Sequence, residues 1–172
     1  MPRPLILPGD EFATRNPMAL GRGICAVEKF WSRDCEAEYS HTGIFQDPKG
    51  KTFEALWTYK SQDFWAAYQG EKAIISRAVL GPDMGRIKNV IGALVETYQG
   101  KWYPVWRLPM HIFPPLAKIA WAKRPVCAEL NAMYEWMIGV RHKHWASTNP
   151  DTKVDEWRQW DAFEIIWEGV VE

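Results

Sequence analysis

The sequence has few cysteines, no net charge and no long hydrophobic run, and each lack excludes a class of protein. Its three cysteines, Cys25, Cys35 and Cys127, are too few and odd in number for a disulfide framework, which indicates a reducing compartment. Lys plus Arg and Asp plus Glu both number 21, so no net field attracts nucleic acid or an anionic membrane. No run is long enough to span a bilayer, and the N-terminal apolar run is too short and proline-broken for a signal peptide. We therefore expect a cytoplasmic protein with neither nucleic-acid nor membrane partners.

The composition is that of a globular domain. Hydrophobic residues make up 47% of the 172 residues and charged residues 24%, which suits a chain with a real core. The eleven tryptophans suit a dense core, a sugar- or peptide-binding groove, or an interface. The sequence predicts a single domain over residues 1–172, in which residues 1–22, rich in proline and glycine, form an irregular arm.

Hydrophobic patterns predict strands in the first half of the chain and helices in the second. We expect strands over residues 24–31, 39–46, 52–59 and 72–80, with a turn at 48–51 and a short helix over 61–70. Helices are expected over residues 83–100, 115–123 and 124–140, a loop over 146–157, and a last helix, or helix plus strand, over 155–171. This order predicts an α+β fold.

Cys127 is the first candidate for a reactive group. It follows Pro125, which suits the first turn of a helix, so the thiol is expected at the helix N-terminus. The free N–H groups and the positive end of the dipole there stabilise a thiolate. Leu130 and Tyr134, three and seven residues further on, share its face, so the thiol is expected to point inward. The alternative is a buried cysteine that acts as a small hydrophobic residue.

His41 and Glu54 are the candidate partners of the thiol. Catalysis by a thiolate needs an imidazole that takes and returns the proton, and a third polar group that orients the imidazole. A hairpin of strands 39–46 and 52–58 would place Glu54 opposite the His41 strand, where its carboxylate could accept from the ring. The alternatives are a histidine that is only packed in a core or at an edge, and a glutamate that faces solvent.

Four stretches in a fixed order resemble one family of enzymes. They are YSHTGIF, TFEALW, AIISRAVL and, after a long gap, VCAEL at a helix start. They resemble the circularly permuted papain-like hydrolases of the YiiX/YebB-like branch of the NlpC superfamily, in which the histidine strand precedes the cysteine helix. The resemblance covers residues 24–140. Ala128 and Thr42 stand where the family has a serine after the cysteine and a valine after the histidine.

The resemblance implies a permuted papain-like (NlpC-type) α+β fold in which an antiparallel sheet packs against helices. It implies that Cys127 is the nucleophile, His41 the general base and acid, and Glu54 the orienting residue, with the N–H of Cys127 in the oxyanion hole. The activity implied is that of a cysteine hydrolase, which cleaves an amide or ester bond through an acyl-enzyme. The substrate classes implied are a peptide, a peptidoglycan fragment or a lipid amide, with no cofactor and no metal.

The remaining histidines and cysteines are interpreted as structural. His142 and His144 lack further metal ligands at a useful spacing and suit the basic end of a helix. Cys25 and Cys35 are near no predicted helix start, and packing is the simplest role for His111.

Two other functions compete with hydrolysis. A catalytically inactive interaction module or phage accessory module could keep the same fold and use the aromatic residues for an interface, because one fold serves many functions. An acyltransferase of the lecithin–retinol type would instead pass the acyl group to an amine or alcohol. The separation of the Cys127 sulfur and the His41 ring distinguishes an enzyme from an inactive module.

Overall fold

The computed structural model describes residues 3–15, 38–79, 83–104, 124–146 and 148–172. Its strands are β1 (Glu11–Thr14), β2 (His41–Phe45), β3 (Lys51–Ala55), β4 (Tyr59–Asp63), β5 (Lys72–Ala78) and β6 (Phe163–Val170). Its helices are α2 (Phe64–Ala67), α3 (Met84–Tyr98), α6 (Cys127–Ile138) and α7 (Pro150–Gln159). The predicted strand over 24–31 and helix over 115–123 lie outside the described residues, as do Cys25, Cys35 and His111.

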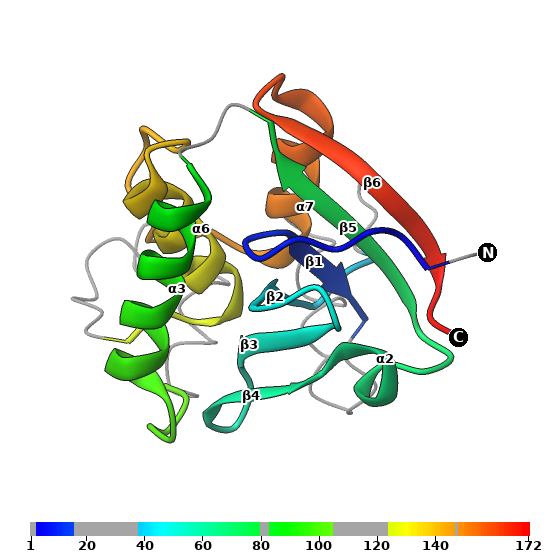
Figure 1. Ribbon diagram of the computed structural model, residues 1–172, viewed down its shortest axis with the longest axis horizontal. Helices are drawn as coiled ribbons and strands as arrows, with labels where there is room; N and C mark the ends of the chain where they lie inside the picture. Colours follow the sequence, from blue (N-terminus) through cyan, green and yellow to red (C-terminus); the bar gives the residue numbers. More distant parts are fainter. Residues whose placement is uncertain (1–2, 16–37, 80–82, 105–123, 147) are drawn as a thin grey trace.

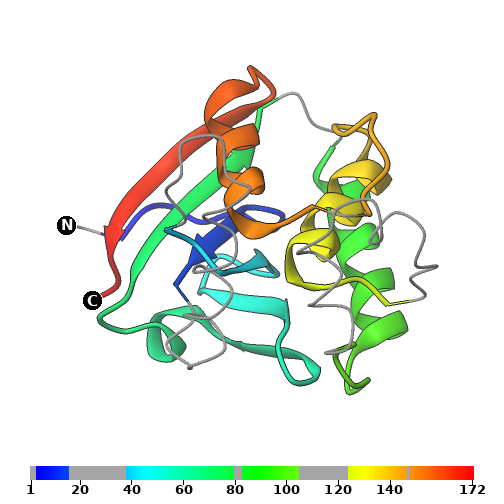
Figure 2. The same ribbon diagram turned by 180° about the vertical axis from the view of Figure 1, so that it is seen from behind.

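The strands form one six-stranded sheet with the order β4-β3-β2-β1-β5-β6. Every neighbouring pair in it is antiparallel. Helices α3 and α6 lie together beside the β2–β3 part of the sheet, and α7 lies against β5 and β6 (Figures 1 and 2). The prediction of an α+β fold with an antiparallel sheet is therefore confirmed.

Strand β1 differs from the prediction, because the segment 1–22 was expected to be an irregular arm throughout. Residues Glu11–Thr14 instead lie in the middle of the sheet and pair with β2 on one side and β5 on the other. Phe12 and Ala13 are fully buried there. Only four residues long and preceded by three prolines, the strand is specified by pairing on both sides rather than by its local pattern.

Two apolar layers cover the two faces of the sheet near β2. Ile44 and Phe53 pack with Leu130 and Tyr134 of α6 in one cluster. Phe12 and Phe45 pack with Phe64 and Tyr68, from α2 and the residue after it, in another. The start of β2 thus lies where side chains from both layers can reach it.

Helix α6 begins three residues later than the start of the predicted helix 124–140, so Pro125 precedes the helix instead of lying in its first turn. Val126 is its N-cap, and the Glu129 carboxylate accepts from the Val126 N–H at 3.0 Å. The carbonyl of Pro125 accepts from the hydroxyl of Tyr59, which fixes the chain just before the helix. Gly139, at a φ of 88°, ends the helix in the left-handed conformation that favours glycine. Cys127 is therefore the first residue of α6, as its position after a proline predicts.

The C-terminal part of the chain differs from the prediction, because most of the loop expected over 146–157 belongs to helix α7. Asn149 caps α7 by accepting from the Thr152 N–H at 2.7 Å, and Pro150 occupies the first position of the helix. Over residues 155–171 the structure has the end of α7 followed by the strand β6, so the expected helix plus strand is present and a single last helix is not. Runs of Ser, Thr, Asn and Pro favour loops, but the same residue types also cap helices, which explains the error.

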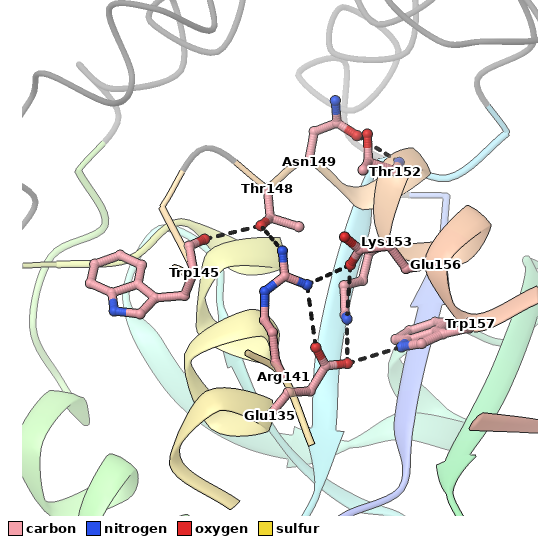
Figure 3. Close-up of polar contacts among 9 residues, drawn as sticks. All are labelled: Glu135, Arg141, Trp145, Thr148, Asn149, Thr152, Lys153, Glu156 and Trp157. Carbon is pink, nitrogen blue, oxygen red and sulfur yellow. Dashed lines mark hydrogen bonds and ion pairs between the residues drawn. The ribbon is translucent and has the colours of Figure 1, made fainter. Parts of the chain in front are cut away.

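A buried cluster of charged residues joins α7 to the end of α6 (Figure 3). Lys153, fully buried, forms ion pairs with Glu135 and Glu156, and Arg141 forms ion pairs with the same two carboxylates. The Trp157 indole donates to Glu135 at 3.3 Å. The two cations and two carboxylates balance, which lets these charges lie in the interior.

Candidate active site

Three residues from three elements meet at the start of β2. His41 is the first residue of β2, Glu54 lies in β3, and Cys127 is the first residue of α6. The predicted hairpin of β2 and β3 is present, with Gly43 opposite Glu54. The structure therefore brings together all three side chains that the sequence singled out.

His41 and Glu54 form a buried pair. The ring nitrogen Nε2 lies 2.9 Å from Glu54 Oε2, and the side chains are 2% and 0% exposed. The alternative interpretation, in which Glu54 faces solvent, is therefore wrong. A carboxylate that accepts from Nε2 fixes the ring orientation and leaves Nδ1 for another partner.

The Cys127 side chain is the other neighbour of the ring, close enough to change the pKa of His41. Burial alone would lower the pKa of His41, but hydrogen bonds with Cys127 and Glu54, and the negative charges of both, raise it to about 9. The imidazole is therefore held as an imidazolium at neutral pH. Such a ring, placed between a thiol and a carboxylate, stabilises a thiolate next to it.

The Glu54 carboxylate is surrounded by hydrogen-bond donors. Besides His41, it accepts from the Gln62 amide at 3.0 Å and from the hydroxyls of Thr52 and Tyr68. The carboxylate is fully buried, and these donors replace the water it has lost. The arrangement holds Glu54 in one orientation toward His41.

Sequence reasoning did not identify Thr52, Gln62 or Tyr68. Thr52 could have been found, because it lies two residues before Glu54 and so on the same face of the strand. Gln62 lies opposite Thr52 in the β3–β4 pair, within a segment that was predicted to be a helix. Tyr68 follows the short helix α2, and its approach to Glu54 depends on tertiary packing.

Tyr103 is a further neighbour of the cysteine. Burial, together with the charge of Cys127, raises the pKa of the Tyr103 hydroxyl. Its own N–H donates to the carbonyl of Trp57 at 2.9 Å, which ties it to the segment between β3 and β4. Tyr103 therefore places a buried polar group next to Cys127.

Asn131 fixes the cysteine helix against the histidine strand. One turn of α6 after Cys127, its side-chain amide donates to the backbone carbonyl of Gly43 at 3.0 Å. Asn131 is fully buried, and Gly43 is two residues from His41. This bond sets how far along β2 the helix can lie, and so where the thiol meets the ring.

His144 makes only local contacts among those that the structure describes. His144 Nδ1 accepts from the Ala146 N–H at 3.2 Å, and its ring stacks on Trp145. Over the described ranges, no three or more His, Cys, Asp or Glu side chains form a group suited to a metal ion. Within those ranges, no helix combines the length and apolar character that a membrane crossing needs.

Comparison with known proteins shows a likeness of fold but no match at the level of sequence families. No protein-family model matches the chain, and no curated protein matches it. The fold is similar to that of yiiX from Escherichia coli O157:H7, described as a metalloprotein and as DUF1105, with a TM-score of 0.62 and 12% sequence identity. The likeness covers 96% of this chain and 99% of the other, so this chain has a YiiX-like fold.

Proposed function

We propose that this protein is a cysteine hydrolase that cleaves an amide or ester bond through an acyl-enzyme on Cys127. The observation that carries the proposal is the position of His41, whose ring is bonded to Glu54 at 2.9 Å and whose pKa is raised by the neighbouring Cys127 side chain. A thiol, an imidazole and an orienting carboxylate in this sequence of contacts form the arrangement that nucleophilic catalysis requires. The substrates we expect are peptides, peptidoglycan fragments or lipid amides.

Each residue of the triad has a defined task. The thiolate sulfur attacks the carbonyl carbon, and the backbone N–H of Cys127 donates to the oxyanion that forms. The His41 imidazolium then gives its proton to the leaving amine or alcohol, which leaves a thioester on Cys127. Neutral His41 next takes a proton from water, whose oxygen attacks the thioester, and the thiolate and the acid are released. Glu54 stabilises the imidazolium in both steps.

We further propose that the fold is a circularly permuted papain-like one. The YiiX-like fold and the α+β architecture with an antiparallel sheet support this proposal. The order along the chain also supports it, because the histidine strand β2 comes before the cysteine helix α6. The three side chains can make the same contacts whatever their order in the sequence, so a permuted chain can form the same site.

The test is turnover by the wild type and by Cys127→Ala and His41→Ala variants. Peptide, peptidoglycan-fragment and lipid-amide substrates are offered, and an acyl-enzyme of the matching mass is sought by mass spectrometry. We expect turnover and a covalent adduct on Cys127 in the wild type, and neither in Cys127→Ala, with unchanged circular dichroism. Full turnover by Cys127→Ala would contradict the proposal.

Iodoacetamide labelling gives a test that needs no substrate. Cys25 and Cys35 are internal references, and the reaction is followed peptide by peptide near neutral pH. An activated Cys127 should be modified faster than either reference in the wild type, and the advantage should disappear in His41→Ala. Modification of Cys25 or Cys35 as fast as Cys127 would overturn the activated thiol.

The alternative of an inactive module on the same fold has one observation in its favour. The Cys127 side chain is only 5% exposed, so access to the sulfur is narrow. The two functions differ in the labelling result, because an inactive module should show slow alkylation that does not depend on His41. An acyltransferase would instead be recognised by transfer of the acyl group to an added amine or alcohol.

A further inference from the structure

We propose that Tyr68 is a positioning residue whose hydroxyl holds the Glu54 carboxylate in place and aimed at His41. The inference rests on the proposed function, because it assigns a role within the same site. The Tyr68 hydroxyl donates to Glu54, while the Tyr68 ring packs near the His41 ring, so the hydroxyl would act through Glu54. It is the first residue after α2 and is 3% exposed.

The contacts show how the hydroxyl could act. Tyr68 donates to Glu54 Oε2, the same oxygen to which His41 Nε2 is bonded. The Gln62 amide also donates to this oxygen, at 3.0 Å, and lies 3.3 Å from the Tyr68 hydroxyl oxygen. Because Oε2 has a limited number of acceptor directions, two fixed donors leave His41 a defined one. The position of the imidazole therefore depends on the phenol.

The charges around Glu54 support the same role. Among the described residues, the donors to this carboxylate are His41 and three neutral groups, from Thr52, Gln62 and Tyr68. Burial of a carboxylate costs free energy unless hydrogen bonds replace its hydration. Here most of those hydrogen bonds come from neutral groups. A lysine or arginine in their place would compete with the positive charge on His41. Neutral donors keep the carboxylate available to the imidazolium.

The aromatic packing makes Tyr68→Phe a clean substitution. The Tyr68 ring lies 6.0 Å from the His41 ring, 5.6 Å from Phe12 and 5.6 Å from Phe64, measured between ring centroids. These contacts involve only carbon atoms of the phenol ring. The variant therefore removes one hydroxyl while the ring packing is retained.

The loss of the hydroxyl should change the pH at which the site becomes reactive. The titratable groups that face His41 are Glu54 from β3, Cys127 from α6 and Tyr68 itself, with Tyr103 against the thiol. With one donor fewer, the carboxylate is held less firmly, and its hydrogen bond with His41 weakens. The imidazolium is then less well stabilised next to the thiol. The reaction of Cys127 should therefore need a higher pH than in the wild type.

The experiment measures the rate of Cys127 alkylation by iodoacetamide from about pH 4 to about pH 9. In Tyr68→Phe we expect the acid-side midpoint to rise by roughly one pH unit, the size of one hydrogen bond to a charged group. The matched control is Tyr39→Phe, which removes a phenol that donates to another carboxylate, Glu168, at 3.1 Å. Its midpoint should equal that of the wild type. Circular dichroism and urea unfolding verify that each variant folds.

The outcomes separate this inference from the proposed function. A wild-type midpoint equal to that of the unfolded chain would mean that Cys127 is not activated, and the proposed function itself would fail. An activated wild type with the same midpoint in Tyr68→Phe would overturn the role of Tyr68 alone. Gln62→Met, at a half-buried position, removes the other side-chain donor to Oε2 and serves if Tyr68→Phe does not fold. A higher alkylation midpoint in Gln62→Met would support the role of the neutral donors to Glu54 Oε2. An unchanged midpoint would overturn that role.

Discussion

At the residue scale, the site depends on the absence of a side chain at Gly43. A Cβ built there would lie 2.6 Å from Phe12 Cε1 and 2.7 Å from Glu54 Cγ. Both separations are far below an ordinary carbon–carbon contact. Gly43 thus leaves the space in which Glu54 lies under His41, while its carbonyl accepts from Asn131 of α6.

Gly43→Ala should therefore disturb the site more than the fold. We expect Glu54 to be displaced, with a loss of roughly 100-fold in kcat/KM or in the alkylation rate of Cys127, and about 1–3 kcal/mol of stability. The control is Gly92→Ala in α3, where a Cβ meets no atom within 4 Å. It should keep wild-type reactivity and gain up to about 1 kcal/mol from helix propensity. Equal reactivity in both variants would contradict the role of Gly43.

His41 gives a second prediction at this scale. Its pKa is raised to about 9, so the imidazolium should persist well above the ordinary pKa of histidine. A proton NMR titration of the ring should give a midpoint near 9 in the wild type. In Cys127→Ala the midpoint should be lower, because one hydrogen bond and one negative charge are lost. A midpoint near 6.5 in the wild type would show that the ring is not held as an imidazolium.

The same titration has a consequence for stability. A histidine whose folded pKa is raised contributes stability that is fully present below its unfolded pKa, near 6.5, and is lost as the pH rises through about 9. Urea unfolding of the wild type and of His41→Ala should therefore converge toward alkaline pH. If the stabilities of the two proteins instead moved apart between pH 6.5 and about 9, the raised pKa of His41 would be contradicted.

The sequence indicated the triad but not what supports it. His41, Glu54 and Cys127 belong to short motifs with recognisable neighbours, and the turn at 48–51 set the hairpin that joins two of them. The contacts of Tyr68 and Asn131 depend on how layers pack over the sheet. Neither residue lies in a local sequence pattern that predicts its contact, because the contact joins segments that are distant in the sequence.

At the scale of elements, α7 is attached to α6 by charges rather than by apolar contacts alone. Lys153 is fully buried and is paired with Glu135, which is fully buried too. The first part of α7 was expected to be a loop because of the Ser, Thr, Asn and Pro residues at and before its start, although Lys153, Val154 and Trp157 all face the interior. Pairing of buried charges cannot be read from a single hydrophobic pattern.

Lys153→Met should be strongly destabilising. It removes one partner and leaves the Glu135 carboxylate with less compensation, which costs about 3–5 kcal/mol for a buried pair. Lys72→Met provides the comparison, because Lys72 pairs with Glu38 at 2.7 Å but its side chain is 48% exposed. That change should cost less than about 1 kcal/mol. Urea unfolding measures both, and similar costs for the two variants would contradict the importance of the cluster.

At the scale of the whole molecule, Glu11 connects the central strand to this cluster. Its carboxyl group is buried, and burial, together with the negative charge of Glu135, raises its pKa well above the ordinary value, against the opposing charge of Lys153. Glu11 therefore keeps its proton in the folded state at a pH where the unfolded chain has lost it. A protonated Glu11 carries no charge, so β1 can lie near Glu135 of α6 without repulsion between two carboxylates.

The whole fold should accordingly lose stability as the pH rises above about 4.5, where Glu11 ionises only when unfolded. Each pH unit in this window costs up to about 1.4 kcal/mol. Glu11→Gln, which is always neutral, should match the wild type near pH 4 and be the more stable protein near pH 8. Unfolding curves at both values test this, and a variant that is less stable at the higher pH would refute it.

The central place of β1 also bears on how the chain is made. This strand leaves the ribosome before all the others, yet both of its partners, β2 and β5, are synthesised much later. Until they emerge, Phe12 has no sheet to join, and pairings between such distant segments form slowly. Newborn chains should therefore depend on chaperones that shield the amino-terminal end during translation.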